Sequence, residues 1–256
     1  MGKSHRLAER RHEILLAIEK TGKLTVEESS TLFDVSEVTI RQDFQALHEQ
    51  GFLLRTRGGA VSNNRMAEFS FDVRQQQNAT QKRRIGQAAA KFISHGDTIF
   101  LDASTTAHSV IPYIKNISEL TVITNSIKAS MNFLDSPQIQ VILIGGNLRR
   151  ESISLVGSGC EELLAEINIQ TGFFGARGVT VEEGLTDVNV DEVGIKKIMV
   201  DRCRQVVGVI DSTKWGKVAA YTFARLDQID CLVSDKDTPG DLVEETKENQ
   251  VEIILV

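Results

Sequence analysis

The sequence predicts an α/β protein in two parts: a small N-terminal unit of three helices and a β-hairpin, and a larger C-terminal unit built on a largely parallel sheet. Apolar residues recur at helical spacing through the first part of the chain. From residue 82 onward, runs of valine, isoleucine and leucine alternate with amphipathic segments, which is typical of a parallel sheet covered on both faces. A length of 256 residues suits two unequal domains.

The N-terminal elements follow from capping and turn residues. A first helix is expected over 7–20, with Gly22 just beyond its end. Thr25 can cap a short second helix that ends at Leu32, and Ser36 can cap a third that runs to about Gln50. The run FLLRTRGGAVS then predicts a strand, a Gly-Gly turn and a second strand.

The chain is expected to divide into 1–61, a polar connector at 62–81 that is rich in glutamine and asparagine, and 82–256. The C-terminal strands are expected at 98–102, 120–124, 139–146, 171–176, 206–211, 231–235 and 251–256. The C-terminal helices are expected at 82–93, 106–114, 127–134, 159–167, 190–203 and 241–250.

Composition excludes several classes of protein. Hydrophobic content is 41% and charged content 25%, both ordinary for a globular protein. The three cysteines, at 160, 203 and 231, form neither a metal-binding spacing nor a disulfide framework. No stretch has the length and apolarity of a membrane span or signal peptide, so a cytoplasmic protein is expected. A net charge of −6 does not by itself indicate nucleic-acid binding.

The stretch VSEVTIRQDF is organised as a two-faced helix. Val35 and Ile40 are spaced as a hydrophobic staple around the Ser36 cap, and the face with Phe44 and Leu47 is expected to pack inward. The opposite face presents Val38, Thr39, Gln42 and Gln45, with Arg41 at its edge. Such side chains suit base edges in a DNA major groove. A plain solvated helix face is the alternative.

Context favours DNA. Two helices joined by a short turn form a helix-turn-helix, which presents its second helix to the duplex. The hairpin that follows is a wing that carries Arg55 and Arg57 for phosphate or groove contacts, beside Gly58 and Gly59, where the backbone can approach a phosphate closely. Positive charge also gathers in residues 1–11, which are expected to flank the duplex together with the wing. The expected DNA-binding residues are Ser36, Val38, Thr39, Arg41, Gln42, Gln45, Arg55, Arg57, Gly58 and Gly59.

These residues carry a resemblance to a known family. VSEVTIRQDF followed by LLRTRGGA resembles the N-terminal signature of the DeoR family of bacterial transcriptional regulators. Gln42 stands where a second basic residue is common in that family, and Arg57 where histidine is common. Gln42 bears on base preference, and Arg57 makes the hairpin more basic than is usual in the family.

Small polar or glycine-rich turns follow several C-terminal strands. Ligands of open parallel sheets lie beyond the carboxyl ends of the strands, and hydroxyls with free N–H groups there suit an anion such as phosphate. Alternatively, these small residues serve only the geometry of the turns and bind no ligand. No GxGxxG or P-loop motif is present, so no nucleotide cofactor is expected. The expected effector residues are Asp102, Ser104, Thr105, Thr106, Asn125, Ser126, Gly145, Gly146, Gly175, Arg177 and Lys214.

The run from GDTIFLDASTT through LTVITNS, the GGN turn, GLTD and DSTKWGK resembles the effector domain of the same family. The resemblance implies a fold related to ribose-5-phosphate isomerase and a phosphorylated sugar as effector. Ser104 replaces a common glycine, and Arg177 stands where aspartate is frequent. An added arginine favours a more acidic ligand.

We therefore expect a DNA-binding repressor of a sugar or carbohydrate catabolic operon, homo-oligomeric through its second domain, and not an enzyme. The alternative is a sugar-phosphate isomerase-like enzyme that carries a DNA-binding module. An RNA binder would need an aromatic stacking surface, and the module has few exposed aromatic residues. Acid–base groups for the enzymatic alternative are Asp102, Asp187, Asp191, Glu192, Lys196, Asp211 and Lys214.

Overall fold

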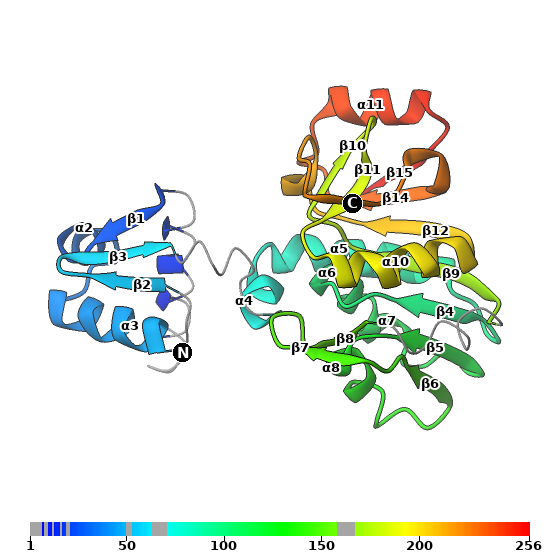
Figure 1. Ribbon diagram of the computed structural model, residues 1–256, viewed down its shortest axis with the longest axis horizontal. Helices are drawn as coiled ribbons and strands as arrows, with labels where there is room; N and C mark the ends of the chain where they lie inside the picture. The colour runs from blue at the N-terminus through cyan, green and yellow to red at the C-terminus, as the bar shows by residue number, and fades with distance from the viewer. Residues whose placement is uncertain are drawn as a thin grey trace. The chain divides into compact units, whose positions relative to one another are not determined.

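The computed structural model describes residues 7, 10–11, 13–15, 17–18, 21–49, 53–62, 71–157 and 167–256 (Figure 1). The chain divides into two compact units, Met1–Gln76 and Gln77–Val256. The division falls inside the polar connector expected at 62–81. Within the described ranges, no helix combines the length and apolarity that crossing a membrane requires.

The N-terminal unit combines helices with a three-stranded antiparallel sheet. The residues described between Leu7 and Thr21 are helical, and the expected end of this helix lies partly outside the described residues. The second and third helices are α2 (Val26–Leu32) and α3 (Glu37–Glu49). The sheet has the order β1 (Lys23–Thr25), β3 (Gly59–Ser62), β2 (Leu53–Thr56). The expected hairpin is therefore present, with an additional strand, β1, that the sequence did not reveal.

Two polar side chains set where α2 and α3 begin. Thr25 Oγ1 accepts from Glu28 N at 3.1 Å, and Glu28 Oε2 accepts from Thr25 N at 2.9 Å, which is a complete capping box. Ser36 Oγ accepts from Thr39 N at 3.2 Å, so both expected helix starts are confirmed. The core of the unit is formed by Ile14, Leu15, Ile18, Leu24, Val26, Ile40, Phe44, Leu47, Leu53 and Ala60.

The turn of the wing differs from the Gly-Gly turn expected. Arg57 and Gly58 form the turn, and Gly59 is already the first residue of β3. A Cβ on Gly59 would lie 2.1 Å from the carbonyl oxygen of Leu24 in β1, whereas one on Gly58 would meet nothing within 4 Å. Gly59 is thus required for close packing of two strands, and only Gly58 is exposed at the tip.

Replacing Gly59 with alanine is expected to destabilise the N-terminal unit by about 1–3 kcal/mol or more, because a backbone carbonyl must move to admit the methyl group. Gly58→Ala is the matched control, and its effect is expected to stay within about 0.5 kcal/mol. Amide hydrogen exchange at β1 and β3 measures both. Equal protection in the two variants would contradict the packing role of Gly59.

The C-terminal unit is built on a seven-stranded sheet in which all neighbouring strands are parallel. This confirms the expected largely parallel α/β architecture. In spatial order the strands are β15 (Glu252–Leu255), β14 (Cys231–Ser234), β12 (Cys203–Val209), β9 (Ile169–Phe174), β4 (Thr98–Leu101), β5 (Leu120–Thr124) and β6 (Ile139–Leu143).

Helices cover both faces of this sheet (Figure 1). Alternate residues along β4 belong to different clusters: Phe100 packs with α10, while Ile99 and Leu101 pack with α5 and α7. The described helices of this unit, including short 3-10 segments, are α5 (Ala79–Ala89), η2 (Ala90–Phe92), α6 (Thr105–His108), α7 (Ile111–Ile114), α8 (Ile127–Met131), α10 (Val190–Arg202), η3 (Ser212–Lys214), η4 (Leu226–Gln228) and α11 (Gly240–Glu248). A further helix, α4 (Phe71–Gln76), ends the N-terminal unit. The helix expected at 159–167 lies almost entirely outside the described residues.

The single helix expected at 106–114 is two short helices, α6 and α7. Pro112 occupies the first turn of α7. Proline lacks an N–H, and its ring collides with the carbonyl of the residue four positions earlier, here His108, so a continuous helix cannot pass through it. Ser109, between the two helices, donates from Oγ to the Lys82 carbonyl of α5 at 2.7 Å.

Five short antiparallel strands were not expected from the sequence. They are β7 (Asn147–Arg149), β8 (Ser154–Val156), β10 (Gly178–Thr180), β11 (Gly184–Asp187) and β13 (Tyr221–Ala224). β7 and β8 form a hairpin, and β10, β11 and β13 form a separate small sheet. Segments of three or four residues are too short for an alternating pattern to be recognised.

His108, in α6, links stability to pH. Burial lowers the pKa of its imidazole from 6.5 to about 4, with a further contribution from Lys128. The unfolded chain therefore binds this proton more strongly than the folded chain does. The stability that neutral His108 contributes is present above pH 6.5 and is lost as pH falls toward 4.

Between pH 7 and pH 5, this group alone is expected to remove about 2 kcal/mol from the free energy of unfolding. Urea denaturation of wild type and His108→Gln at the two pH values tests this. The variant is expected to lose much less stability over that interval. Identical losses in both proteins would show that another group carries the pH dependence.

Candidate DNA-binding surface and effector rim

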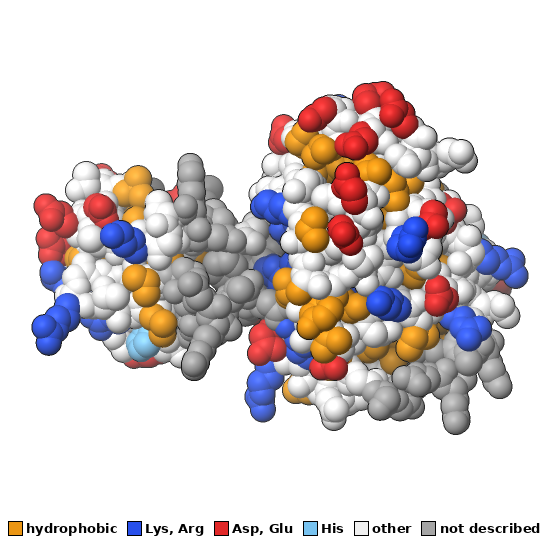
Figure 2. Space-filling view, turned by 45° about the horizontal axis from the view of Figure 1, so that its top comes forward, with side chains coloured by type: hydrophobic (Ala, Val, Ile, Leu, Met, Phe, Trp, Pro, Cys, Tyr) orange, Lys and Arg blue, Asp and Glu red, His pale blue; other side chains and the backbone are white. Residues whose placement is uncertain are grey.

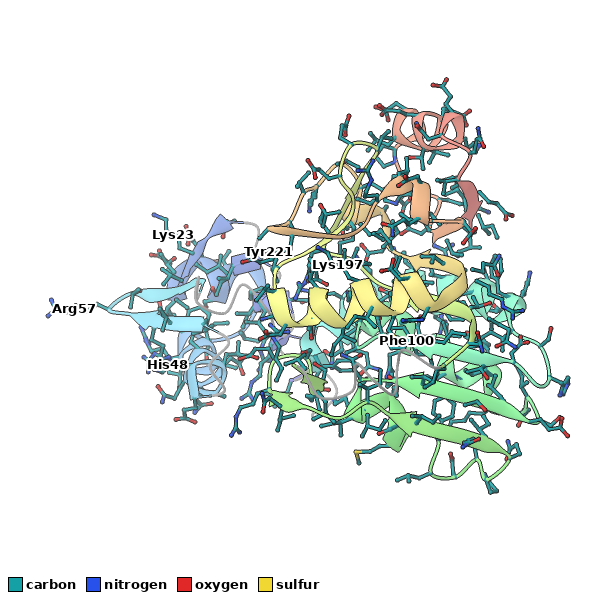
Figure 3. All side chains as sticks on the ribbon, turned by 45° about the vertical axis from the view of Figure 1, so that its right-hand side comes forward. Lys23, His48, Arg57, Phe100, Lys197 and Tyr221 are labelled. Atoms are coloured by element: carbon teal, nitrogen blue, oxygen red, sulfur yellow. The ribbon has the colours of Figure 1, made fainter. Side chains whose placement is uncertain are left out.

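The outward face of α3 and the wing form a shallow hollow. Its volume is about 340 Å³, and it is lined by Val38, Arg41, Gln42, Gln45, Ala46, Glu49 and Arg55. Five of these residues were expected to bind DNA. Ser36 and Thr39 lie at the start of the same helix, and Arg57 extends from the tip of the wing (Figure 3).

Several of these polar side chains are paired with one another. Arg41 Nη2 donates to Glu37 Oε2 at 2.5 Å on the exposed face of α3. Gln45 Nε2 donates to Glu49 Oε1 at 2.6 Å, and Arg55 Nη1 donates to Gln45 Oε1. Glu49 was not among the residues expected at this surface, although its position four residues after Gln45 places the two side chains on one helix face.

Two of the arginines near the N-terminus are paired within the N-terminal unit. Arg10 Nε donates to Asp43 Oδ2 at 2.7 Å and Arg11 Nε to Asp43 Oδ1 at 2.8 Å. Asp43 is buried at 1% exposure on the inner face of α3. The two arginines therefore tie the first helix to α3. This pairing accounts for part of the charge that was counted toward the duplex.

The expected effector residues all follow the carboxyl ends of β4, β5, β6, β9 and β12, which are consecutive strands of the parallel sheet in the order β12-β9-β4-β5-β6. They therefore lie along one edge, which we call the strand rim. Asp102 and Thr106 follow β4, Asn125 and Ser126 follow β5, and Lys214 follows β12 in η3. Gly145 and Gly146 follow β6, and Gly175 and Arg177 follow β9.

A buried lysine of α10 joins three segments near the strand rim. Lys196 Nζ lies 3.0 Å from Asp102 Oδ2 and 2.7 Å from Asp187 Oδ2, and it donates to the Gly175 carbonyl at 2.7 Å. Asp102 Oδ2 also accepts from Gly175 N at 2.9 Å. Lys196, Asp102 and Asp187, which we call the lysine hub, thus fasten the ends of β4, β9 and β11 to one helix.

The lysine hub is charged. Burial alone would lower the pKa of Lys196, but the carboxylates of Asp102, Asp187 and Glu192 outweigh it and raise that pKa above its ordinary value. Burial alone would raise the pKa of Asp187, and the Lys196 ammonium reverses this and holds the pKa below its ordinary value. The acid–base groups considered for an enzyme therefore converge in part, but as an ion-paired cluster. Asp211 instead accepts from Thr213 N in its own turn.

Several rim side chains have structural partners. Ser104 caps α6 by accepting from Ala107 N at 3.1 Å, and Ser126 caps α8 by accepting from Ala129 N at 3.2 Å. Asn125 donates to the Leu155 carbonyl at 3.3 Å, and its buried Oδ1 has no hydrogen-bond partner among the described residues. A Cβ on Gly175 would lie 2.2 Å from Ser104 Oγ. Glycine at 175 is therefore coupled to serine at 104.

The β7–β8 hairpin is fastened to this edge. Leu155 N donates to the Asn125 carbonyl at 2.8 Å. Arg149 Nη1 lies 3.1 Å from Glu192 Oε1 of α10, and Ser154 Oγ donates to the same oxygen at 3.0 Å. The hairpin thus connects the end of β5 with the first turns of α10, close to the lysine hub.

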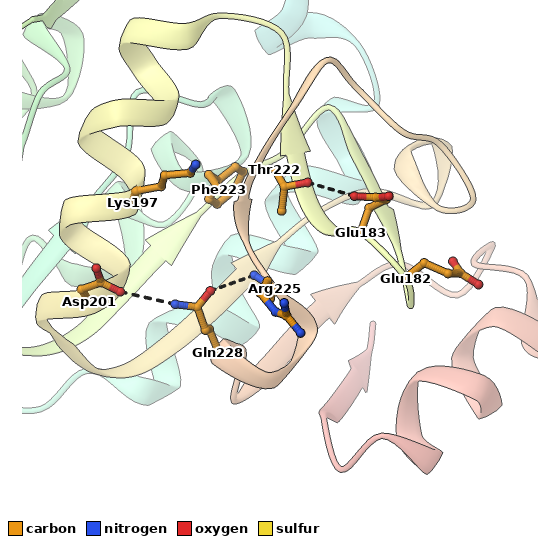
Figure 4. Close-up of a pocket in the computed structure, with 8 residues that line it drawn as sticks. All are labelled: Glu182, Glu183, Lys197, Asp201, Thr222, Phe223, Arg225 and Gln228. Atoms are coloured by element: carbon orange, nitrogen blue, oxygen red, sulfur yellow. Dashed lines mark hydrogen bonds between the residues drawn. The ribbon is translucent and has the colours of Figure 1, made fainter.

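A second hollow of about 500 Å³ lies between α10, the β10–β11 turn and the segment that follows β13 (Figure 4). No expected effector residue lines it. Its polar groups pair locally, as when Thr222 donates to Glu183 at 3.2 Å and Gln228 to Asp201 at 3.3 Å. Acidic, basic and apolar side chains are interspersed over the face of the C-terminal unit that Figure 2 shows.

Comparison with known proteins agrees with both units. Residues 10–66 match the family model of the DeoR-like helix-turn-helix domain, and residues 77–236 match that of the DeoR C terminal sensor domain. Among curated proteins, the chain is 36% identical to the HTH-type transcriptional regulator GolR of Listeria innocua, over 89% of this chain and 90% of that one. It is 34% identical to the HTH-type transcriptional repressor GlcR of Bacillus subtilis, over 89% and 88%.

Among solved structures, a D-ribose-5-phosphate isomerase in complex with phospho-erythronic acid aligns with a TM-score of 0.41 and 17% identity over 54% of each chain. The family models and the curated relatives identify a transcriptional regulator and not an enzyme. The resemblance seen in VSEVTIRQDF and LLRTRGGA is confirmed: the chain belongs to the DeoR family of DNA-binding transcriptional regulators.

Proposed function

We propose that this regulator is a repressor of a sugar or carbohydrate catabolic operon, and that a phosphorylated sugar bound at the strand rim changes its affinity for DNA. The name of one similar protein, the repressor GlcR, supports repression. The polar turns that line up along one edge of the sheet support an anionic effector. On this proposal the protein acts in the cytoplasm.

The lysine hub carries the proposal. A ligand can shift an equilibrium only if it binds the two states with different affinity. Because Lys196 ties the ends of β4, β9 and β11 to α10, an anion that touches any of these loops also acts on the others. The proposed rim residues are Asp102, Ser104, Thr105, Thr106, Asn125, Ser126, Gly145, Gly146, Gly175, Arg177 and Lys214.

The proposed DNA contacts are Ser36, Val38, Thr39, Arg41, Gln42, Gln45, Arg55, Arg57 and Gly58, with Gly59 allowing β3 to pack closely on β1. One such module makes few contacts, so specific binding is expected to need two or more copies on repeated half-sites. A homo-oligomer formed through the C-terminal unit is part of this proposal. Analytical ultracentrifugation with and without a duplex of two half-sites tests it.

A thermal-shift screen of phosphorylated sugars against the full chain tests the effector. A sugar phosphate that binds the folded state is expected to raise Tm, and the shift is expected to grow with the logarithm of its concentration once that concentration exceeds Kd. The unphosphorylated sugar is the control and is expected to leave Tm unchanged. If sugar and sugar phosphate gave equal shifts, the anionic character of the site would be contradicted.

Arg177 offers a sharper test of the same site. It lies near enough to Asp187 to lower the pKa of that carboxyl, and it is expected to add affinity for a doubly phosphorylated sugar over a singly phosphorylated one. Arg177→Asp is therefore expected to lower the ratio of the two affinities by about tenfold or more. Isothermal titration measures both ligands. An unchanged ratio would remove Arg177 from the site.

A further inference from the structure

The side-chain amide of Gln45 is engaged at both ends. Its Nε2 donates to Glu49 Oε1 at 2.6 Å, and its Oε1 accepts from Arg55 Nη1. A carboxylate, an amide and a guanidinium thus form one chain from α3 to β2. The sequence had suggested that Gln45 reads a base edge and that Arg55 contacts phosphate or the minor groove.

The charges at the two ends strengthen this chain. Hydrogen bonds to ionised groups are shorter and stronger than neutral ones, and linked hydrogen bonds polarise each other. By accepting from the Gln45 amide N–H, the Glu49 carboxylate polarises that amide, which makes its carbonyl oxygen a better acceptor for Arg55. The guanidinium is thereby held beside Arg41 and Gln42, in the hollow that faces away from the core.

A fixed guanidinium is more than phosphate binding requires. A phosphate contact depends mainly on charge, and lysine can supply it. Guanine recognition instead needs the planar fork of arginine aimed at O6 and N7. Arg57, at the tip of the wing, offers a contrast because it is exposed and no hydrogen bond or ion pair of its side chain is found within the described part of the chain.

We propose that Arg55 is a specificity-determining residue that reads a guanine in the major groove together with α3, and that Gln45 and Glu49 are positioning residues that orient its guanidinium. The inference rests on the DNA-binding function of α3 and the wing. It changes the expected role of Arg55 from a general contact to a sequence-reading one, and it makes Glu49 part of the interface.

The test begins with the full-length protein and a library of random DNA duplexes. The best duplex selected by wild type is then varied one base pair at a time, and each Kd is measured. Arg55→Lys is expected to reduce discrimination at one G·C pair by roughly 5- to 150-fold while leaving the other positions unchanged. The matched variant Arg57→Lys is expected to preserve discrimination at every position.

Glu49→Ala distinguishes a positioning role of Glu49 from a purely structural one. Removing a carboxylate near the duplex is expected to strengthen binding to random DNA, while discrimination at the Arg55 base pair falls. Glu49→Gln keeps an acceptor for Gln45 and is expected to retain more of that discrimination. The single variant Arg55→Ala and the double variant with both Arg55→Ala and Glu49→Ala are expected to show the same residual discrimination, because the two residues act through one contact.

Two results would overturn the proposal: full discrimination in Arg55→Lys, or a uniform loss across all base pairs. Both differ from failure of the DNA-binding function itself, in which wild type would select no duplex from the library. Circular dichroism of each variant confirms that the helices remain folded.

Discussion

Replacing Lys196 with methionine is expected to destabilise the C-terminal unit by about 3–5 kcal/mol, the range for removing one partner of a buried ion pair. Methionine fills similar space, so the loss comes from charge. Asp102 and Asp187, exposed by only 2% and 5%, would be left without the cation that lies within 3.0 Å of both. The Gly175 carbonyl would also lose its donor.

The chain provides a selective probe and a matched control for this experiment. Trp215 is its single tryptophan, lies in the C-terminal unit and donates to Ser234 Oγ at 3.0 Å. Its fluorescence therefore reports on that unit alone. Lys197, adjacent on α10, is exposed and lines the hollow drawn in Figure 4. Lys197→Met is expected to change the free energy of unfolding by less than about 0.5 kcal/mol.

The deficit of Lys196→Met should also depend on pH. In wild type, Asp187 has a lowered pKa, so its stabilising contribution is present above its unfolded pKa, near 4, and is lost as pH falls through its folded pKa. Without Lys196, the largest attraction that offsets burial at Asp187 is lost, so the pKa of that carboxyl is expected to rise. The difference between variant and wild type is expected to shrink in acid. A variant as stable as wild type at pH 7 would show that the lysine hub is dispensable.

Replacing Asp43 with alanine is expected to destabilise the N-terminal unit by about 3 kcal/mol, the lower end of the range for breaking a buried pair. The lower end applies because the partners, Arg10 and Arg11, keep 17% and 25% of their side chains exposed and can turn toward water. Loss of the carboxylate frees the first helix from α3. DNA affinity is expected to fall at least about tenfold, since α3 loses its fixed orientation.

Glu13→Ala is the control for the loss of charge, because it also removes one negative charge, from an exposed position of the first helix. That variant is expected to bind DNA as tightly as wild type or slightly more tightly. Amide hydrogen exchange along α3 measures the N-terminal unit, and Trp215 fluorescence should be unchanged in both variants. If Asp43→Ala bound DNA as Glu13→Ala does, the ion pairs would have no role in presenting α3.

Long-range architecture was predictable where physical signals were strong. Runs such as LTVIT and VVGVI are near-continuous apolar strands, and the helices between them predict parallel neighbours. Both helix starts at Thr25 and Ser36 followed from local capping chemistry. β1, with the sequence KLT, carries no such signal, because a three-residue strand is formed by its partner β3 and not by its own pattern.

The candidate site was predictable only in part, because a sequence shows which residue types are present but not which of them come together in the fold. Asp102, Asp187 and Lys196 were each recognisable as ionisable groups, the two aspartates beside strand ends and the lysine within the helix expected at 190–203. Lys196 can join all three loops only because α10 lies across the sheet. Asp43 could have been anticipated, since it lies three residues after Ile40 and four before Leu47 on the inward face of α3.

The most direct test of the whole account is a titration of the full-length protein with its own promoter region, with and without the sugar phosphate found by thermal shift. The account predicts sequence-specific binding, a change in Kd of about fivefold or more when the effector is present, and recovery of the effector chemically unchanged. A Kd that no sugar phosphate alters, or conversion of the sugar phosphate to another compound, would contradict it.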